Sequence, residues 1–265
     1  MQGLNTKHTL NMQYNAINNL IKQQSLICIN DKMIINSMNK RNLLTTCFLL
    51  FSFLIKGQEL KVINSIREYR KTLKQDTNNQ MVRVQQIIPT AVMDIRYATT
   101  NNFTGEILYP PSFEVFLRKP VADSLVKIQS ELNNQGFGLK IFDAYRPYDV
   151  TVKMWDLIHD ERYVANPAKG SGHNRGISVD LTIIDLSTGK ELYMGTGYDH
   201  FSDTAHHSFK KLPPNVLKNR EFLKSIMEKH GFKPLETEWW HYHLVWPNNF
   251  EVLNLQPRQL KKIKL

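Results

Sequence analysis

A carboxylate, Asp180, stands near the middle of the apolar, β-branched run 176–184. The β-branched content of this run predicts a buried strand. A carboxylate inside a protein is unfavourable unless it is paired or binds a metal ion. The fold must therefore bring other polar groups to Asp180.

Two histidine-containing segments offer such groups. His173 lies seven residues before Asp180, across a glycine turn, in the segment SGHNRGISVD (171–180). The second segment, EWWHYH (238–243), opens an apolar run that predicts a strand over about 239–245. Side chains alternate between the faces of a strand, so His241 and His243 would share a face, and Glu238, just before the strand, could reach the same place.

These residue types suit a catalytic metal. One neutral imidazole from each segment and the Asp180 carboxylate would supply two nitrogen ligands and one oxygen ligand, with a fourth tetrahedral position left open, as in catalytic zinc sites. A zinc ion lowers the pKa of a bound water to about 7. Glu238, three residues from His241, is then the candidate to take the proton of that water and pass it on.

The residues alone leave alternatives open. A lone histidine beside a strand is more often a hydrogen-bonded core residue than a ligand, so a buried polar cluster without a metal is one alternative. Either His241 or His243 could face the metal. His206 and His207 form a further pair, which we interpret as loop residues or as outer partners of the ligands.

Helical and strand patterns alternate along the chain without the regular spacing of βαβ units, which predicts one compact α+β domain. The spacing of apolar residues predicts helices over 59–75, 120–132, 150–158 and 215–230. Short apolar runs predict strands over 81–88, 92–97, 139–142, 176–184 and 239–245. The domain is expected to span 81–257, after a helical extension and linker at 58–80 and before a basic tail at 258–265.

Five segments carry a further signal: DIRYATTNNFTG (94–105), FDAYRPYDV (142–150), SGHNRGISVDLT (171–182), YMGTGYD (193–199) and EWWHY (238–242). Together, and in this order, they resemble the zinc D-alanyl-D-alanine dipeptidases, the VanX type within the D,D-peptidase family M15. The resemblance extends over about 84–246. It implies a central antiparallel sheet flanked by helices, the D,D-peptidase or hedgehog-like arrangement, and it implies a metal site.

The resemblance also assigns the metal site. It implies that His173, Asp180 and His241 hold one Zn²⁺ per chain. It makes Glu238 the general base and acid. His241 is thereby preferred to His243 as the second histidine ligand.

The remaining implied residues concern the substrate. Arg146 would stabilise negative charge on the oxygen of the scissile carbonyl. Tyr97 and Asp199 would hold the free ammonium of a dipeptide, and Ser171 would touch the bound dipeptide. The segment 159–169 is expected to be a loop whose length varies without consequence for the chemistry.

The expected function is hydrolysis of D-alanyl-D-alanine to D-alanine by metal-activated water, in cell-wall metabolism or glycopeptide resistance. A site that binds an ammonium would reject longer or capped peptides, because its polar groups would be left unpaired. A D,D-carboxypeptidase or peptidoglycan endopeptidase with the same ligands and a more open groove is one alternative. A non-catalytic wall-binding zinc domain is the other.

Residues 1–57 are expected to be absent from the mature enzyme. The segment 1–37 is rich in Asn, Gln and Ile and suits a packed core poorly, so we interpret it as an N-terminal extension. Lys40 and Arg41, an apolar run at 43–55 and Gly57 follow the plan of a signal peptide over 38–57. The run is shorter than the ~20 residues of a transmembrane helix, and a buried core helix is the alternative.

The signal peptide predicts an exported, periplasmic protein with no stable membrane anchor after cleavage, or a cytoplasmic protein if the signal is not used. Both cysteines, Cys28 and Cys47, lie in the part that would be removed. A mature protein without thiols suits an oxidising compartment.

The formal charge of +10, from 34 Lys and Arg against 24 Asp and Glu, lies mainly at the two ends of the chain. Residues 1–57 hold six basic residues and one Asp, 258–265 hold four basic residues, and 58–257 hold 24 basic and 23 acidic residues. The catalytic domain is therefore close to neutral, and no run of basic and aromatic residues in 81–257 indicates nucleic acid. The expected partner is a small dipeptide substrate, and the sequence sets no oligomeric state.

Overall fold

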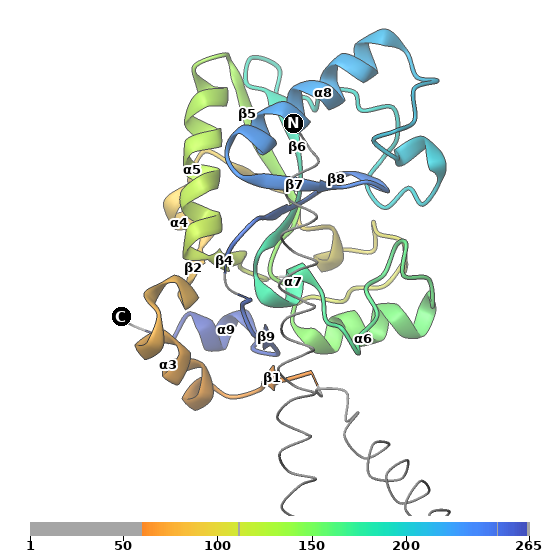
Figure 1. Cartoon of the computed structure of the whole chain (residues 1–265). Helices are drawn as coiled ribbons and strands as arrows, with labels where there is room; N and C mark the ends of the chain where they lie inside the picture. Colours follow the sequence, from red (N-terminus) through yellow and green to blue (C-terminus); the bar gives the residue numbers. More distant parts are fainter. Residues whose placement is uncertain (1–59, 111, 248, 264–265) are drawn as a thin grey trace, which may run out of the picture. The chain divides into compact units, whose positions relative to one another are not determined.

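A five-stranded sheet lies at the centre of the part of the chain that the computed structural model describes, residues 60–110, 112–247 and 249–263 (Figure 1). Its strands, in spatial order, are β3 (Val92–Met93), β5 (Phe137–Asp143), β6 (Ser178–Asp185), β8 (Glu238–Leu244) and β7 (Phe232–Leu235).

The sheet is mixed rather than wholly antiparallel, which corrects the expected arrangement. β3 and β5 are parallel, whereas the other neighbours are antiparallel. Parallel neighbours need a crossover connection. Here the chain passes through β4 (Phe116–Arg118) and α5 (Lys119–Asn133) between β3 and β5.

Helices α5 and α8 (Pro214–Lys229) pack on the sheet and complete the main core. Each has a proline in its first turn, where the missing N–H removes no intrahelical hydrogen bond. Leu125 of α5 and Leu223 of α8 are fully buried in the same cluster as Leu181 of β6. These helices, together with α6 (Tyr148–Leu157), confirm those expected over 120–132, 215–230 and 150–158.

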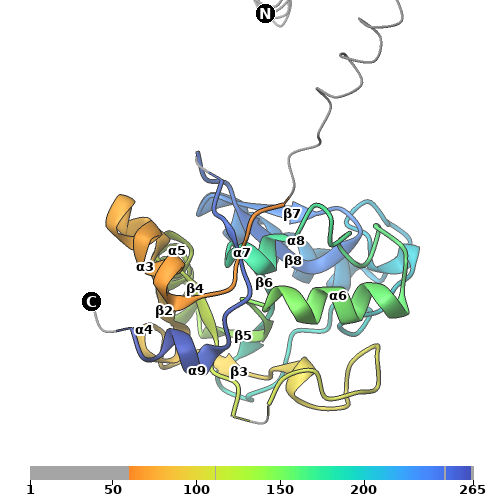
Figure 2. The same cartoon turned by 90° about the horizontal axis from the view of Figure 1, so that it is seen from below.

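The two ends of the described chain meet in a second core cluster. β1 (Val62–Ile63) pairs in parallel with β9 (Val252–Leu253), and α3 (Ile66–Gln75) and α9 (Pro257–Leu260) bury Tyr69 and Leu260 in this cluster. Figures 1 and 2 show α3 and α9 at the same end of the molecule. The segment 258–265, expected as a tail, therefore begins inside a helix.

Three observed elements differ from the expected ones. Helix α3 begins at Ile66 rather than at 59, because the Ser65 hydroxyl caps it by accepting a hydrogen bond from the backbone N–H of Glu68 (3.2 Å). The strand expected over 81–88 is β2 (Met81–Arg83), which pairs with β4 and is followed by α4 (Val84–Ile87). The strand expected over 92–97 ends at Met93. A short apolar run fits a strand or a buried helical turn equally well, so its length could not decide.

The described residues also contain three short 3₁₀ helices: η1 (Thr77–Asn79), η2 (Arg96–Ala98) and η3 (Asp203–Ala205).

Arg118, the last residue of β4, forms hydrogen bonds with three segments that lie far apart in the sequence. Its buried guanidinium donates to the backbone oxygens of Asn79 (2.6 Å), Arg175 (2.8 Å) and Glu251 (3.1 Å). Burial lowers the pKa of Arg118 to about 10, which still leaves it charged at neutral pH. A charge satisfied by three separate carbonyls fixes these segments relative to one another.

Residues 1–59 lie outside the described chain. The extension at 1–37, the signal peptide at 38–57 and the cleavage near Gly57 therefore stay predictions from the sequence. Among the described residues, no helix combines the length and the apolar composition that a membrane crossing requires.

Candidate metal centre and substrate cavity

Three polar side chains reach one place from α7, β6 and β8. His173 lies in α7 (Gly172–Arg175), a single turn that ends at Gly176 in the left-handed conformation (φ 72°) and leads into β6. Asp180 of β6 stands directly opposite His241 of β8 in the antiparallel register. Opposed residues of paired strands place their side chains on the same face of the sheet.

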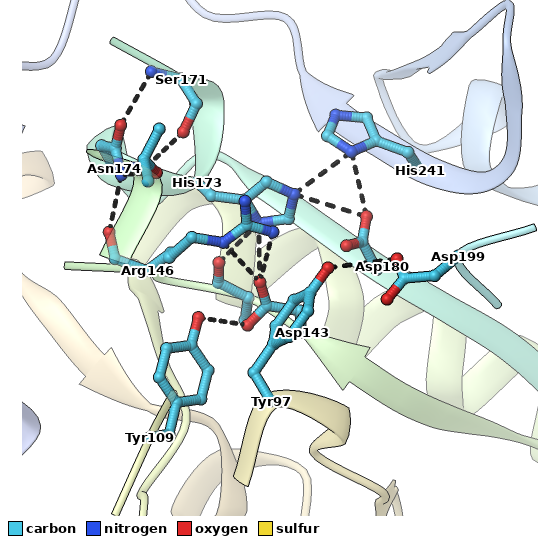
Figure 3. A network of polar contacts seen from close by, with 12 residues as sticks. Tyr97, Tyr109, Asp143, Arg146, Ser171, His173, Asn174, Asp180, Asp199 and His241 are labelled. Carbon is cyan, nitrogen blue, oxygen red and sulfur yellow. Dashed lines mark hydrogen bonds and ion pairs between the residues drawn. The ribbon is translucent and has the colours of Figure 1, made fainter. Parts of the chain in front are cut away.

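The three ligand atoms are spaced as a tetrahedral metal ion requires (Figure 3). His173 Nε2 lies 3.2 Å from His241 Nδ1 and 3.4 Å from Asp180 Oδ1, and His241 Nδ1 lies 3.0 Å from Asp180 Oδ1. Zinc bonds of about 2.0–2.1 Å at the tetrahedral angle separate neighbouring ligand atoms by about 3.3 Å. The triad therefore fits a small divalent cation without rearrangement.

The protonation of the triad suits a cation as well. His173 Nδ1 lies 2.6 Å from the Ala144 carbonyl oxygen, so Nδ1 carries the proton and Nε2 is free to bind. Burial lowers the pKa of His241, which keeps its ring neutral.

The hydrogen bonds of the Asp180 carboxylate also indicate a cation site. Tyr198 donates to Asp180 Oδ2 (3.0 Å), whereas the buried Oδ1 accepts no hydrogen bond within the described residues. Buried polar atoms in proteins are nearly always paired. A carboxylate oxygen that faces two imidazole nitrogens without a hydrogen bond is what a cation site offers.

Arg146 is held rigidly beside the triad. Its Nε and Nη2 donate to Asp143 Oδ2 (3.0 and 2.8 Å), and its guanidinium lies 5.0 Å from the centre of the Tyr97 ring. Tyr109 donates to the other oxygen of Asp143 (2.9 Å). Burial opposes the charge of Arg146, but Asp143 raises the pKa of Arg146 well above its usual value. Arg146 is therefore a fixed positive charge.

Asp143 and Asn174 contact Arg146, and the sequence analysis did not identify them. Both are fully buried, and Asn174 Nδ2 donates to the Arg146 carbonyl oxygen (2.9 Å) and to Thr151 Oγ1 (2.8 Å). The signal for Asp143 was present, since it is a carboxylate at the end of an apolar strand, three residues before an arginine. The argument that a buried carboxylate needs a partner applies to it as it does to Asp180.

Glu238 is the first residue of β8 and lines the same cavity as His241. Strict alternation would place the two on opposite faces, but the β7–β8 register shifts beside Glu238, between Pro234 and Leu235. Glu238 Oε2 lies 3.8 Å from His241 Nδ1. Burial, and then the nearby carboxylates Asp180 and Asp199, raise the pKa of Glu238 well above its usual value, so it holds a proton readily.

Tyr97 and Asp199 form a second polar pair in the site (Figure 3). Tyr97 donates to Asp199 Oδ1 (3.1 Å), and the backbone N–H of Phe103 lies 3.4 Å from Asp199 Oδ2. Asp199 adopts φ 58°, a left-handed conformation that aspartate and asparagine tolerate better than most residues. Burial raises the pKa of Asp199 to about 7. A cation beside Asp199 would favour the ionised carboxylate and would be bound by it.

Ser171 supports the helix that carries His173. Its hydroxyl accepts from the backbone N–H of Asn174 (3.0 Å), while its own N–H donates to Asn174 Oδ1 (2.9 Å). This reciprocal capping box fixes the first turn of α7.

One cavity of about 270 Å³ collects the predicted residues. All eight line it: Tyr97, Arg146, Ser171, His173, Asp180, Asp199, Glu238 and His241. The structure therefore brings together every site residue that the sequence and its resemblance indicated.

The loop at 159–169 forms part of the cavity wall, which the sequence analysis did not predict. Glu161, Arg162 and Tyr163 line the cavity. Tyr163 stacks on Phe201 with ring centres 4.7 Å apart, and Thr237 donates to the Arg162 carbonyl oxygen (3.1 Å). These contacts with distant parts of the chain hold the loop over the site.

The other histidines lie apart from the triad. The cluster of possible metal ligands in the described chain consists of His173, Asp180 and His241. His243 pairs with Ser178 in the strand register and does not line the cavity.

His206 and His207 follow η3, as the loop interpretation predicted. Their backbone N–H groups donate hydrogen bonds to the carbonyl oxygens of Asp203 and Glu236.

The chain matches the peptidase M15 family model, described as D-ala-D-ala dipeptidase, over residues 77–251. It is similar to the D-alanyl-D-alanine dipeptidase of Escherichia coli (strain K12), with 34% identity over 165 residues that cover 62% of this chain and 84% of the relative. It is also similar to the D-alanyl-D-alanine dipeptidase of Enterococcus faecium, with 32% identity over 191 residues that cover 63% of this chain and 94% of the relative.

Among solved structures, VanYB in complex with D-alanine-D-alanine aligns with 50% of this chain and 73% of its own, at 15% identity and a TM-score of 0.35. That score is too low to establish a common fold. The family match, in contrast, spans more than half of the chain and includes every residue of the metal triad. This chain therefore belongs to the peptidase M15 family of D-Ala-D-Ala dipeptidases.

Proposed function

We propose that this protein is an exported zinc metallopeptidase that hydrolyses free D-alanyl-D-alanine in cell-wall metabolism. The observation that carries the proposal is a single small cavity in which a divalent-cation triad, a fixed arginine and a buried carboxylate–tyrosine pair meet. Its volume of about 270 Å³ lies just below the about 300–1,000 Å³ of pockets for drug-sized ligands. Such a space suits a dipeptide.

Zinc is the proposed metal because two imidazoles and one carboxylate, with room for a fourth ligand, form a typical donor set of catalytic zinc. When bound, zinc would polarise the scissile carbonyl and lower the pKa of a water molecule. His173, Asp180 and His241 would hold it.

Glu238 would carry the proton during hydrolysis. Its carboxylate would take a proton from the attacking water and deliver it to the departing amino group. In the free protein its pKa is raised by burial and by Asp180 and Asp199. A dication beside Asp180 and a substrate ammonium beside Asp199 would offset both carboxylate charges, which brings Glu238 back toward the range where it can accept a proton.

Arg146 would stabilise the negative charge that develops on the scissile carbonyl oxygen. A preorganised charge is effective there because it does not have to move during the reaction. Asp143 and Tyr109 would keep Arg146 in place, since Asp143 accepts hydrogen bonds from Arg146 and from Tyr109.

Asp199 and Tyr97 would bind the ammonium of the free dipeptide. The positive charge would ionise Asp199, whose pKa is about 7 in the free protein. A peptide whose terminal amine is blocked would leave the buried carboxylate unpaired, and a site built to bind a polar group rejects such a substrate strongly.

The test compares hydrolysis of D-Ala-D-Ala with that of a stem pentapeptide ending in D-Ala-D-Ala. We expect kcat/KM to favour the free dipeptide at least about 100-fold, because the pentapeptide has no ammonium at the position that Asp199 faces. Release of alanine from each substrate measures this directly. Preference for the pentapeptide would identify a D,D-carboxypeptidase and contradict the proposal.

Asp199→Asn supplies the matched variant for the same assay. Asparagine keeps the shape and tolerates the left-handed backbone at this position, but it removes the charge. We expect a loss of about 10-fold to 100-fold in kcat/KM for the free dipeptide, the value of a charged hydrogen bond. Any residual hydrolysis of N-acetyl-D-Ala-D-Ala should be unchanged, because that substrate carries no ammonium.

Export is supported by the basic segment, the apolar run and the small residue within 38–57. Expressed as the full chain in a Gram-negative host, the protein is expected in the periplasmic fraction with an N-terminus near Gln58. A variant with arginines at Leu49 and Leu50, inside the apolar run, should keep the protein unprocessed in the cytoplasm. An uncleaved wild-type chain in the cytoplasm would contradict export.

A further inference from the structure

The positive charge of the described chain is concentrated in two segments that the fold brings together. Residues 61–76 and 257–262 hold eight Lys and Arg and two acidic residues, whereas 77–256 hold 19 Lys and Arg and 20 acidic residues. The pairing of β1 with β9 and the cluster shared by α3 and α9 join the two segments. The domain is therefore neutral through most of its length and basic at the end that holds α3 and α9, whose positions Figures 1 and 2 show.

Helix α3 presents its basic residues as one stripe. Positions 67, 70, 71 and 74 follow the spacing that puts side chains on one face of a helix, and all four are exposed: Arg67, Arg70, Lys71 and Lys74. The opposite face buries Tyr69 and Leu73 in the core. We call the four residues, together with the exposed Arg258 and Lys262, the terminal basic surface.

These six charges are left uncompensated. Within residues 60–110, 112–247 and 249–263, none of them forms a salt bridge, although nearby Lys261 pairs with Glu114 (3.1 Å). Glu68, the acidic residue of α3, bonds to the Ser65 hydroxyl instead (3.1 Å). Like charges at this helical spacing destabilise a helix, and an external anionic partner relieves that repulsion.

We propose that the terminal basic surface docks this protein on an anionic lipid membrane. Lys and Arg held near the surface of an anionic membrane each favour binding by about fivefold. Single-stranded nucleic acid is less suited, because it is bound by exposed aromatic rings that interleave with the charges, and the tyrosine of α3 is buried.

The position of α3 in the chain also favours a membrane. Ten residues, 56–65, separate the apolar run 43–55 from Ile66, the first residue of α3. Ten residues span at most about 35 Å, so α3 stays close to any bilayer that holds this run during export. The residues of the terminal basic surface do not line the catalytic cavity, so docking through this surface is compatible with catalysis.

Cosedimentation of the full chain with vesicles tests the proposal. Vesicles of phosphatidylglycerol and phosphatidylcholine are compared with vesicles of phosphatidylcholine alone. The quantity measured is the ratio of the two partition coefficients. Residues 1–57, with six basic residues and one Asp, are the same in the wild type and in every variant of this test, so a difference between the ratios of two variants does not come from this segment. We expect the combined variant R67Q, R70Q, K71Q and K74Q to lower this ratio at least about tenfold, and high salt to do the same to the wild type.

A matched variant neutralises four lysines elsewhere: K127Q, K153Q, K211Q and K218Q. These lysines are exposed and form no salt bridge within the described residues, so net charge changes by the same amount. Its vesicle ratio should stay within about twofold of the wild type. Hydrolysis of D-Ala-D-Ala by both variants should equal that of the wild type, which shows that they are folded.

Three results would overturn the proposal. The first is equal partition of the wild type on both kinds of vesicle. The second is an equal loss in both variants, which would indicate net charge rather than this surface. The third is loss of heparin binding by the α3 variant with unchanged vesicle binding, which would identify an anionic polymer as the partner.

Discussion

Glu238→Gln is expected to lower kcat for D-Ala-D-Ala hydrolysis by about 10³-fold, with the metal content of the protein unchanged. Glutamine has the shape of glutamate but can neither accept the proton of the attacking water nor deliver one to the departing amine. Glu238 is buried, and it lies outside the triad, 3.8 Å from His241 Nδ1. The substitution should therefore remove proton transfer and leave the ligand atoms in place.

The measurement is activity and metal content on the same sample. Glu236→Gln is the matched control, because Glu236 lies two residues away, is exposed and bonds to the backbone N–H of Ser208 (2.8 Å). Its activity should equal that of the wild type. Full turnover by Glu238→Gln would exclude Glu238 as the proton carrier, and loss of metal would make it a ligand instead. A non-catalytic wall-binding domain would bind the wall equally well with either variant.

The meeting of Asp180 and His241 could be predicted because it depends on local rules. Both lie in apolar strands, side chains alternate along a strand, and a buried carboxylate requires a partner. Those rules did not choose between His241 and His243, which share a face of β8. The register did, since Asp180 pairs with His241 and Ser178 pairs with His243. Register depends on the neighbouring strand and is not encoded in the period of a single one.

The wall of the cavity could not be predicted in the same way. The loop with Arg162 and Tyr163 carries no periodic pattern, and it is held by Phe201 and Thr237, which lie far along the chain. Likewise, the parallel pairing of β3 with β5 involves only two residues of β3, Val92 and Met93. Tertiary contacts decide such short elements, because their local propensity is weak.

The positive charge of the terminal segments also follows from the sequence only in part, because the fold decides which charges lie together. Counting along the sequence makes 58–257 nearly neutral and assigns the remaining charge to the ends. In the folded chain, α3 belongs with α9, because β1 pairs with β9 across about 190 residues of sequence. The basic stripe of α3 therefore adds to the charge of the C-terminal segment instead of being diluted by the catalytic domain.

His241→Gln is expected to weaken Zn²⁺ binding at least about 100-fold and to abolish hydrolysis. Replacing residues that merely support a metal ligand costs about 10-fold to 100-fold in affinity, so removing a ligand costs at least as much. His241 Nδ1 lies 3.0 Å from Asp180 Oδ1 and 3.2 Å from His173 Nε2, and two ligands without the third leave the cation weakly held. Titration with a zinc-sensitive dye and the activity of the same sample measure both effects.

His243→Gln is the control that makes this result specific. His243 points to the same face of β8 but lies two residues further along, which is about 7 Å, whereas a zinc–nitrogen bond is about 2 Å. Its half-buried ring therefore cannot replace that of His241 without moving β8, in which His241 pairs with Asp180 and Tyr242 pairs with Val179 of β6. We expect His243→Gln to bind zinc and hydrolyse D-Ala-D-Ala as the wild type does. The reverse result, loss of zinc with His243→Gln and retention with His241→Gln, would mean that β8 is shifted by two residues in solution, and it would contradict the triad.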